Sequence, residues 1–538
     1  MAEARTGFGA NGAKETYDRL VNDRSSYETR AENAAALTIP SLFPKSSDGA
    51  STDYTQPWQS VGARGLNNIA AKLMLALFPS TPWMRLQLSE FQAKEVLTDP
   101  QQLSQIDASL SMVERILMSF MDANSYHPTL FELLKQLLVA GNGLLYLPPP
   151  EGDQFKPPKL YKLHSYVVQR DPFGTILQMI TYDRVAFAAL PEDVRNTLEG
   201  DHDPDELIDV HTHIYLDDES GDQYLSYQEV GGNEVDGSDG QYPLDSCPWI
   251  PVRYVKMDGE NYGRSHVEEY MGDLQSLENL TESIVKFSMI ASKVVGLVNP
   301  NGITQVRRLV KAQTGDFVPG RVQDIEFLQL DKTADFSVAR TVAENIEGRL
   351  SYAFMLNSAV QRQGERVTAE EIRYVAKELE DTLGGVYSIL ARELQLPIVR
   401  NLMTQLQATQ LIPDMPKEAV EPTVSTGMEA LGRGQDLDKL TQFTNLVIPL
   451  SQVQDPDLNI GNLKVRIANA LGLDTAGLIL TDADKAKQLA QSAMQDGVSA
   501  GAQGIGAGAA AQATASPDAM SAAMDSMGVQ ASPVGQVG

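Results

Sequence analysis

Residues 360–396 read VQRQGERVTAEEIRYVAKELEDTLGGVYSILARELQL, and this stretch decides how the rest of the chain is organised. It begins with a polar segment that contains two arginines and one glycine. Thr368 and Glu371 then match the S/T-x-x-E pattern of a capping box, which predicts the start of a helix. Apolar residues recur behind it every three or four positions, as on one face of a long helix. The stretch therefore predicts a polar loop at the head of a long helix, which Pro397 ends or kinks.

The length and charge of the chain limit its fold and its partners. With 538 residues it is too long for one ordinary core, so roughly two to four structural regions are expected. The formal net charge is −28, and residues 192–239 carry sixteen acidic side chains against a single basic one, Arg195. Tight binding of nucleic acid requires clustered lysines and arginines. The composition therefore disfavours tight DNA binding, but it allows a protein that surrounds DNA without adhering to it.

The cysteine count and the apolar runs predict where the protein is made. Cys247 is the only cysteine, which excludes a disulfide framework or a cysteine zinc site and favours a reducing compartment. The N-terminus does not have the pattern of a signal peptide. The most apolar runs, residues 73–78 and 133–147, are far shorter than a membrane span. We expect a soluble protein that is cytosolic when made and has no membrane partner.

The order of periodic patterns predicts a mainly α-helical α+β chain. Residues up to about 130 have helical spacing. From Leu144 the period approaches two, which predicts a β-hairpin turning at residues 171–174. Further strands are expected at residues 208–216, 224–230 and 249–255, giving a small antiparallel sheet with an acidic face.

After this sheet the helical period returns. Ser265 and Glu268 form a second capping box, and the apolar pattern predicts a helix over residues 266–298. Residues 299–336 are rich in glycine and β-forming residues, which predicts a compact insert before a second helix over 337–358. Helical patterns resume after Pro397, interrupted by an irregular connection at residues 412–423.

Sequence motifs for catalysis or metal binding are weak. No phosphate-binding loop is present, so an ATPase is disfavoured. Asp201, Asp203 and Asp205 resemble the start of an EF-hand loop, but the required glycine and the bidentate glutamate do not follow. His211 and His213 alternate on one predicted strand without a third ligand, which favours a structural role. We therefore predict no active site, metal or cofactor. An enzyme acting on nucleic acid would need converging carboxylates or a metal site.

Basic side chains gather at three places in this acidic chain. They are Lys286 and Lys293 on the first predicted helix, Arg362 and Arg366 in the polar loop, and Arg307, Arg308, Lys311 and Arg321 in the insert. Scattered surface charge explains any one of these residues as well as a functional role does. Repeated around a symmetric ring, each would form a belt of positive charge in an acidic body. The spacing of these basic residues does not itself predict that the protein forms a ring.

Five stretches resemble the head-to-tail connector, or portal protein, of short-tailed phages of the Autographiviridae. They are YETRAENAAALTIPSLFPK (27–45), STDYTQPWQSVGARGLNNIAAKLMLALFP (51–79), LVNPNGITQVRRLVKAQTGDFVPGR (297–321), FMLNSAVQRQGERVTAEEIRYVAKELEDTLGGVYSIL (354–390) and GRGQDLDKL (432–440). The resemblance extends from Ala4 to about Ala490. It implies a phage portal fold of wing, stem, clip and crown, with a small antiparallel β region in the wing, that assembles into a ring.

The resemblance also implies boundaries for these regions. They are 1–265 for the wing, 266–298 for the first stem helix, 299–336 for the clip, 337–358 for the second stem helix, 359–367 for a tunnel loop, 368–396 for a long wing helix, 397–496 for the crown and 497–538 for a flexible Ala- and Gly-rich tail. Gln361, Arg362, Gln363, Gly364 and Arg366 would then face the DNA channel. Lys286 and Lys293 would line the stem lumen, and the basic residues of the insert would serve docking.

The implied function is a dodecameric portal at one capsid vertex, without enzymatic activity. Double-stranded viral DNA would pass through it during packaging by the terminase large subunit, be retained, and leave through the tail. DNA contacts would be non-specific and transient, because an acidic lumen repels phosphates. Other implied partners are a tail adaptor protein, the major capsid and scaffolding proteins, and internal core proteins. The protein would lie in the virion, and in the host cytoplasm during assembly. The alternative is an internal scaffold or core virion protein without a DNA channel.

Overall fold

The computed structural model describes residues 7–45, 48–49, 51–79, 83–88, 100–152, 154–198, 201–291, 296–327, 333–356, 385–413, 420–424 and 445. The chain divides into two units, Met1–Gln435 and Asp436–Gly538. Apart from Asn445, every described residue belongs to the first unit, and so do all the elements below. The predicted helices after residue 424 and the predicted tail lie outside the described residues.

The N-terminal region is mainly helical, as its periodicity predicts, but the prediction is wrong at residues 84–88, which form the strand β1 (Met84–Leu88). Its helices are α1 (Ala13–Ala36), α2 (Val61–Leu77), α4 (Pro100–Ala123) and α5 (Tyr126–Ala140). Leu130, Leu134 and Leu137 of α5 are completely buried in the main core, because their spacing places them on one helix face. α5 ends at Gly141, whose φ of 72° suits glycine and lets its N–H bond to the carbonyl of Leu137.

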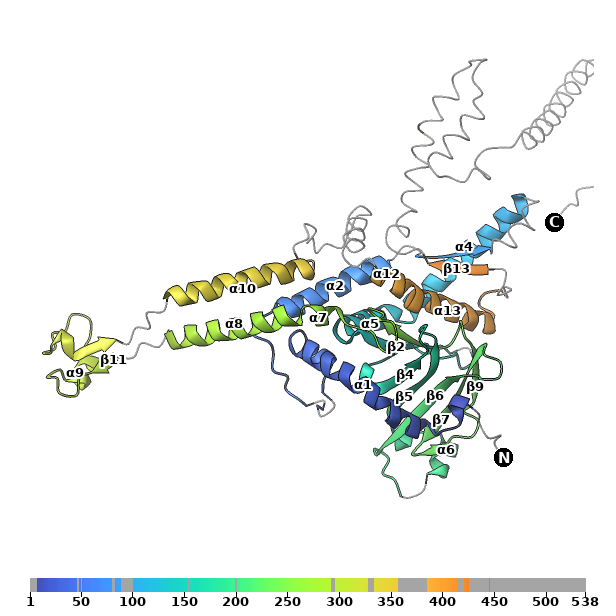
Figure 1. The fold of residues 1–538 in the computed structure, drawn as a ribbon, viewed down its shortest axis with the longest axis horizontal. Coiled ribbons are helices and arrows are strands. Elements are labelled where there is room, and N and C mark those ends of the chain that lie inside the picture. Colours follow the sequence, from blue (N-terminus) through green and yellow to red (C-terminus); the bar gives the residue numbers. More distant parts are fainter. Residues whose placement is uncertain are drawn as a thin grey trace, which may run out of the picture. The chain divides into compact units, whose positions relative to one another are not determined.

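The larger sheet is antiparallel and has the strand order β4-β5-β6-β7-β8, with β9 also paired to β7 (Figure 1). Its strands are β4 (Tyr166–Arg170), β5 (Ile176–Ala186), β6 (Leu207–Leu216), β7 (Gln223–Val230), β8 (Asn233–Glu234) and β9 (Gly240–Pro243). The predicted hairpin at residues 171–174 is confirmed, and Gly174 takes a φ of 95° in its turn. Tyr17 and Leu20 of α1 pack against Val167 and Ile180 of this sheet.

The prediction of one sheet is wrong, because the strand at residue 249 joins a different one. β10 (Trp249–Arg253) pairs with β2 (Asn142–Tyr146), which pairs in turn with β3 (Lys159–Tyr161). The prediction of an acidic face on this sheet is also wrong, because six consecutive residues of β6, from Val210 to Tyr215, are buried. Much of the acidic charge lies in exposed connections such as residues 218–222. Local periodicity identifies a strand, but the choice of partner depends on residues far away in the sequence.

Two helices run antiparallel and pack along each other (Figure 1). They are α8 (Met271–Ala291) and α10 (Thr333–Ala353). Asp273 Oδ1 accepts a 2.8 Å hydrogen bond from Arg349 Nη2, and the rings of Phe287 and Phe336 lie 5.4 Å apart. The cap predicted at Ser265 is confirmed, since Ser265 Oγ accepts a hydrogen bond from the Glu268 amide at the start of α7 (His266–Glu269). The cap predicted at Thr368 lies outside the described residues.

The predicted helix over residues 266–298 is wrong at its C-terminal end and is interrupted near its start. Tyr270 separates α7 from α8, and residues 296–298 form β11 (Gly296–Val298). β11 pairs antiparallel with β12 (Ile325–Phe327), so its backbone groups are satisfied by a segment that helical periodicity cannot detect. In sequence, a helix of six residues, α9 (Val306–Lys311), lies between these two strands.

The second helix also differs from the prediction of residues 337–358, because α10 begins at Thr333 and ends at Ala353. Met355 has a φ of 52°, the Leu356 amide bonds to the carbonyl of Ser351, and the Met355 amide bonds to that of Tyr352. These bonds make a Schellman motif, in which a left-handed residue closes the last turn of a helix. Glycine is the usual residue at this left-handed position, so the methionine there does not mark the end of a helix in the sequence.

Pro397 does not end the helix that precedes it. α12 (Gly385–Leu390) passes into a π-helical turn at Ala391–Gln395 and then into α13 (Leu396–Ala408). A π turn shifts the hydrogen-bond register, which accommodates a proline that has no N–H to donate. The part of the predicted helix before residue 385 lies outside the described residues. The predicted irregular connection at residues 412–423 contains a strand, β13 (Val420–Val424), which pairs with β1 (Met84–Leu88).

Candidate DNA channel and docking surfaces

α8, which lies in the predicted first stem helix, carries acidic as well as basic charge. Lys286 of α8 is exposed and lies 2.6 Å from Glu282 Oε1, one helical turn before it. This i,i+4 pair neutralises the lysine, so Lys286 does not present an isolated positive charge. Lys293, its predicted companion, lies outside the described residues. The sequence contained the signal for the pair, since Glu282 precedes Lys286 by four residues.

The predicted docking cluster lies on the insert. Arg307, Arg308 and Lys311 belong to α9 and are exposed, and Arg321 is exposed on the segment that returns towards β12. Within the described part of the chain, none of these four side chains forms an ion pair. All four side chains are therefore exposed, and three of them lie on one short helix.

A buried aspartate organises the insert below this cluster. Asp324 Oδ2 accepts hydrogen bonds from Thr304 Oγ1 at 2.8 Å and from the Thr304 amide at 3.2 Å. These bonds hold the pKa of the Asp324 carboxyl below its usual range. Thr304 Oγ1 also accepts a hydrogen bond from the Arg321 amide, which ties the basic cluster to this aspartate. No local pattern had marked Asp324, because its partner lies twenty residues away.

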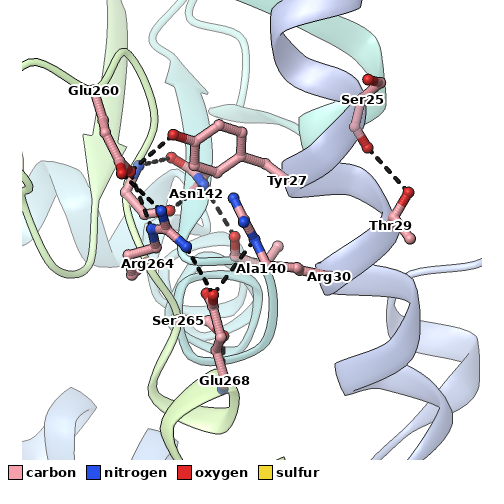
Figure 2. A network of polar contacts seen from close by, with 11 residues as sticks. Ser25, Tyr27, Thr29, Arg30, Ala140, Asn142, Glu260, Arg264, Ser265 and Glu268 are labelled. Carbon is pink, nitrogen blue, oxygen red and sulfur yellow. Dashed lines mark hydrogen bonds and ion pairs between the residues drawn. The ribbon is translucent and has the colours of Figure 1, made fainter.

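α7 and the segment just before it are held to α1 by a polar network (Figure 2). Arg264 donates hydrogen bonds to both Glu260 and Glu268. Tyr27 of α1 donates a 2.8 Å hydrogen bond to Glu260 Oε2, and Arg30 lies 3.4 Å from Glu268 Oε1. Burial and the bond to Glu260 raise the pKa of Tyr27 to about 12. The same bonds lower the pKa of Glu260 and raise that of Arg264.

The end of α10 is held by α2. Asn68 Nδ2 donates hydrogen bonds to the carbonyls of Phe354 and Met355, at 3.0 and 2.9 Å, and Lys72 Nζ donates one to Met355 at 3.1 Å. Buried His266 also packs here, with its ring 5.6 Å from that of Phe354. The chain therefore leaves α10 from a fixed position.

The predicted tunnel loop follows this point, and all its candidate residues lie outside the described residues. They are Gln361, Arg362, Gln363, Gly364 and Arg366.

The two histidines on β6 have structural partners. His213 is completely buried between Tyr227 Oη, at 3.2 Å, and Gln178 Oε1, at 3.0 Å. His211 packs against the rings of Tyr17 and Tyr182, and burial lowers its pKa. Among the described residues, no group of three histidine, cysteine or acidic side chains could hold a metal ion. None of the described helices is long and apolar enough to span a membrane.

Comparison with known proteins identifies the family. Residues 10–479 match the family described as bacteriophage head to tail connecting protein. The chain belongs to this family of phage connectors.

The chain is 65% identical to the portal protein of Escherichia phage T7 over 534 residues, which cover 98% of this chain and 99% of that protein. It is 64% identical to the portal protein of Enterobacteria phage T3, over 99% of this chain and all of that protein. A solved neck of a native GTA particle, computed with C12 symmetry, matches 77% of this chain and 90% of that chain, at 13% identity and a TM-score of 0.36. The family assignment depends on the sequence matches and not on this structure.

Proposed function

We propose that this chain is a portal protein that forms a ring at one capsid vertex and conducts double-stranded DNA. The observation that carries the proposal is the near full-length identity to two phage portal proteins. The alternative of an internal scaffold without a channel has no comparable match among these relatives. Twelve copies is the ring number implied by the resemblance.

Exposed apolar side chains on the stem and insert support a ring. Met289 and Ile290 of α8, and Val338 of α10, are each more than half exposed in the single chain. Phe317 and Val322 of the insert are more than nine-tenths exposed. Soluble monomers seldom expose such groups together, because apolar surface is stabilised by contact with a partner. Neighbouring copies of the same chain, joined side to side around a closed ring, would cover them.

The stem chemistry supports a passive conduit. With Lys286 paired to Glu282, the described part of α8 offers DNA no isolated positive belt, and phosphates would slide past it. The arginines of residues 361–366 would supply weak and replaceable contacts beyond the stem. We assign retention of packaged DNA to this loop and docking of the terminase and the tail adaptor to the basic insert. Capsid, scaffolding and internal core proteins would contact the rest of the ring in the virion, after assembly in the host cytoplasm.

Electron microscopy of the purified protein tests the proposal. We expect rings with a central channel, and no turnover of ATP by the same sample. Monomers over a wide concentration range, or intrinsic ATP hydrolysis, would contradict it.

A further inference from the structure

A cavity of about 590 Å³ lies beside the β4–β5 turn, between β10 and the helical segment from Ser388 to Arg400. Five cationic side chains line it, against two carboxylates, Asp245 and Glu393. The cations are Arg170, Arg253, Lys256, Arg392 and Arg400. The lining thus has a formal charge of +3 in a chain whose net charge is −28. Such a reversal of sign, confined to a concave site, is a mark of anion recognition.

The inner cations outnumber their carboxylates. Arg253 is almost fully buried and forms an ion pair with Glu393. Arg170 donates to three backbone carbonyls instead, those of Asn261 (3.2 Å), Gly174 (3.1 Å) and Pro251 (3.0 Å). Burial, and next the charge of Arg253, lower the pKa of Arg170 to about 10. Two largely buried guanidinium groups therefore share one carboxylate, and a buried charge without a counter-ion is unfavourable.

A third cation is held against the same turn. Lys256 Nζ donates a 3.1 Å hydrogen bond to the carbonyl of Phe173. A Cβ atom built on Gly174 would lie 3.2 Å from Lys256 Nζ and 3.2 Å from Arg253 Nη2. Both charged nitrogens therefore border one point at the edge of the cavity. The turn carbonyls of Phe173 and Gly174 hold Lys256 and Arg170 without neutralising their charges.

Two further arginines complete the site from the helical side. Arg392 lies in the π turn and Arg400 in α13, and both line the cavity. Neither side chain has an ion-pair partner in the part of the chain that the structure describes. Beside them, Trp249 lines the cavity and Phe173 lies at its edge with 86% of its surface exposed. The site thus combines free guanidinium groups with aromatic surface.

We propose that this cavity binds an acidic polypeptide segment, whose carboxylates pair with Arg392 and Arg400 while its apolar side chains contact the aromatic rim. Guanidinium groups bind carboxylates in a bidentate manner, and the aromatic surface suits side chains next to them. A DNA duplex fits poorly, because it presents phosphates along an extended track and not to a concave site with two carboxylates in its wall. The inference goes beyond the portal function and does not depend on ring formation.

Binding of a fluorescently labelled hexaglutamate peptide to the full-length protein tests the proposal by anisotropy, with hexaglutamine as the neutral peptide. We expect hexaglutamate to bind wild type and Arg392→Ala/Arg400→Ala to bind it at least about tenfold more weakly. Arg19→Ala/Arg115→Ala is the matched control, since it removes two exposed arginines, on α1 and α4, that line neither the cavity nor the insert, and it should leave the affinity unchanged. Lys256→Gln removes a cation from another element and should also weaken binding. Higher salt should weaken binding throughout.

Three results would overturn the inference. They are equal affinity in wild type and Arg392→Ala/Arg400→Ala, an equal loss in the control, and displacement of the peptide by inorganic phosphate at the same concentration. The last result would assign the site to small anions. Rings scored by electron microscopy in the same samples separate this outcome from a failure of the portal proposal.

Discussion

Lys72 Nζ donates a 3.1 Å hydrogen bond to the carbonyl oxygen of Met355, 283 residues further along the chain. Met355 has a left-handed backbone and closes α10, so its carbonyl belongs to a helix end that lacks intrahelical partners. A buried ammonium group there satisfies this carbonyl and complements the helix dipole. α2 thus fixes the direction in which the chain leaves α10.

Replacing Lys72 by methionine should destabilise the protein. The Met355 carbonyl keeps its bond from Asn68 Nδ2 but loses its charged donor, and a hydrogen bond to a charged group contributes about 1.5–3 kcal/mol. Urea unfolding measures the loss. Lys286→Met on the exposed face of α8 is the control and should change stability by about 0.5 kcal/mol or less. Equal effects of the two substitutions would show that the bond to Met355 contributes little.

The buried pair of Arg253 and Glu393 should be far more sensitive than a surface pair. In Glu393→Gln the guanidinium of Arg253, of which 3% is exposed, loses its carboxylate, and breaking such a pair costs about 3–5 kcal/mol. Glu344→Gln breaks the exposed pair with Arg340 and should cost about 0.5 kcal/mol or less. Thermal unfolding of both variants gives the comparison. A small loss in Glu393→Gln would mean that water reaches Arg253.

Stability should fall when the pH drops below 6.5, partly through His266. Burial lowers the pKa of this histidine from 6.5 to about 4 in the folded protein. Between these two values the unfolded chain binds a proton that the folded protein does not bind, so this contribution is complete above pH 6.5 and is lost towards pH 4. The slope is about 1.4 kcal/mol per pH unit.

His266→Gln should remove this part of the pH dependence, measured by urea unfolding at pH 7 and pH 5. An unchanged difference between the two pH values would assign the effect to other groups, such as His164, whose pKa burial also lowers to about 4.

Charge reversal on the insert should separate docking from assembly. Arg307→Glu/Arg308→Glu changes two exposed side chains without ion pairs in the described chain, so rings should form normally. Affinity for the terminase should fall by about tenfold or more, because rim charges control association. Arg115→Glu/Arg340→Glu, at two exposed arginines outside the insert, is the matched control because it changes the net charge by the same amount. Should rings fail while the control assembles, the cluster lies between subunits instead.

Deletion of residues 361–366 should leave ring formation intact but impair packaging or retention of the genome. The deleted residues have no apolar side chain to bury, and the Ser351–Tyr352 carbonyls that close α10 lie outside the deletion. Heads containing the deleted chain should package DNA poorly or lose it after filling, measured by DNA content against wild-type heads. Normal packaging and retention would show that the segment only connects two helices.

Features set by neighbours in the sequence could be predicted. The Ser265–Glu268 cap and the hairpin at residues 171–174 are confirmed, since each depends on a few consecutive side chains. The end of α8 and the partner of β10 could not be predicted, because β12 and β2 decide them from afar. The exposure of Arg307 and Arg308 agrees with the docking hypothesis. The cavity that unites Arg170 with Arg400 had no local signal.

The two contacts between α8 and α10 have a mechanical consequence. Asp273 meets Arg349 near one end of the pair, and Phe287 meets Phe336 near the other. A slide of one helix past the other by one turn, about 5.4 Å, would break both contacts together. The two helices therefore resist sliding past each other and behave as one rigid unit. A force applied to the insert is then transmitted through both helices together to α2 and to the Arg264 network.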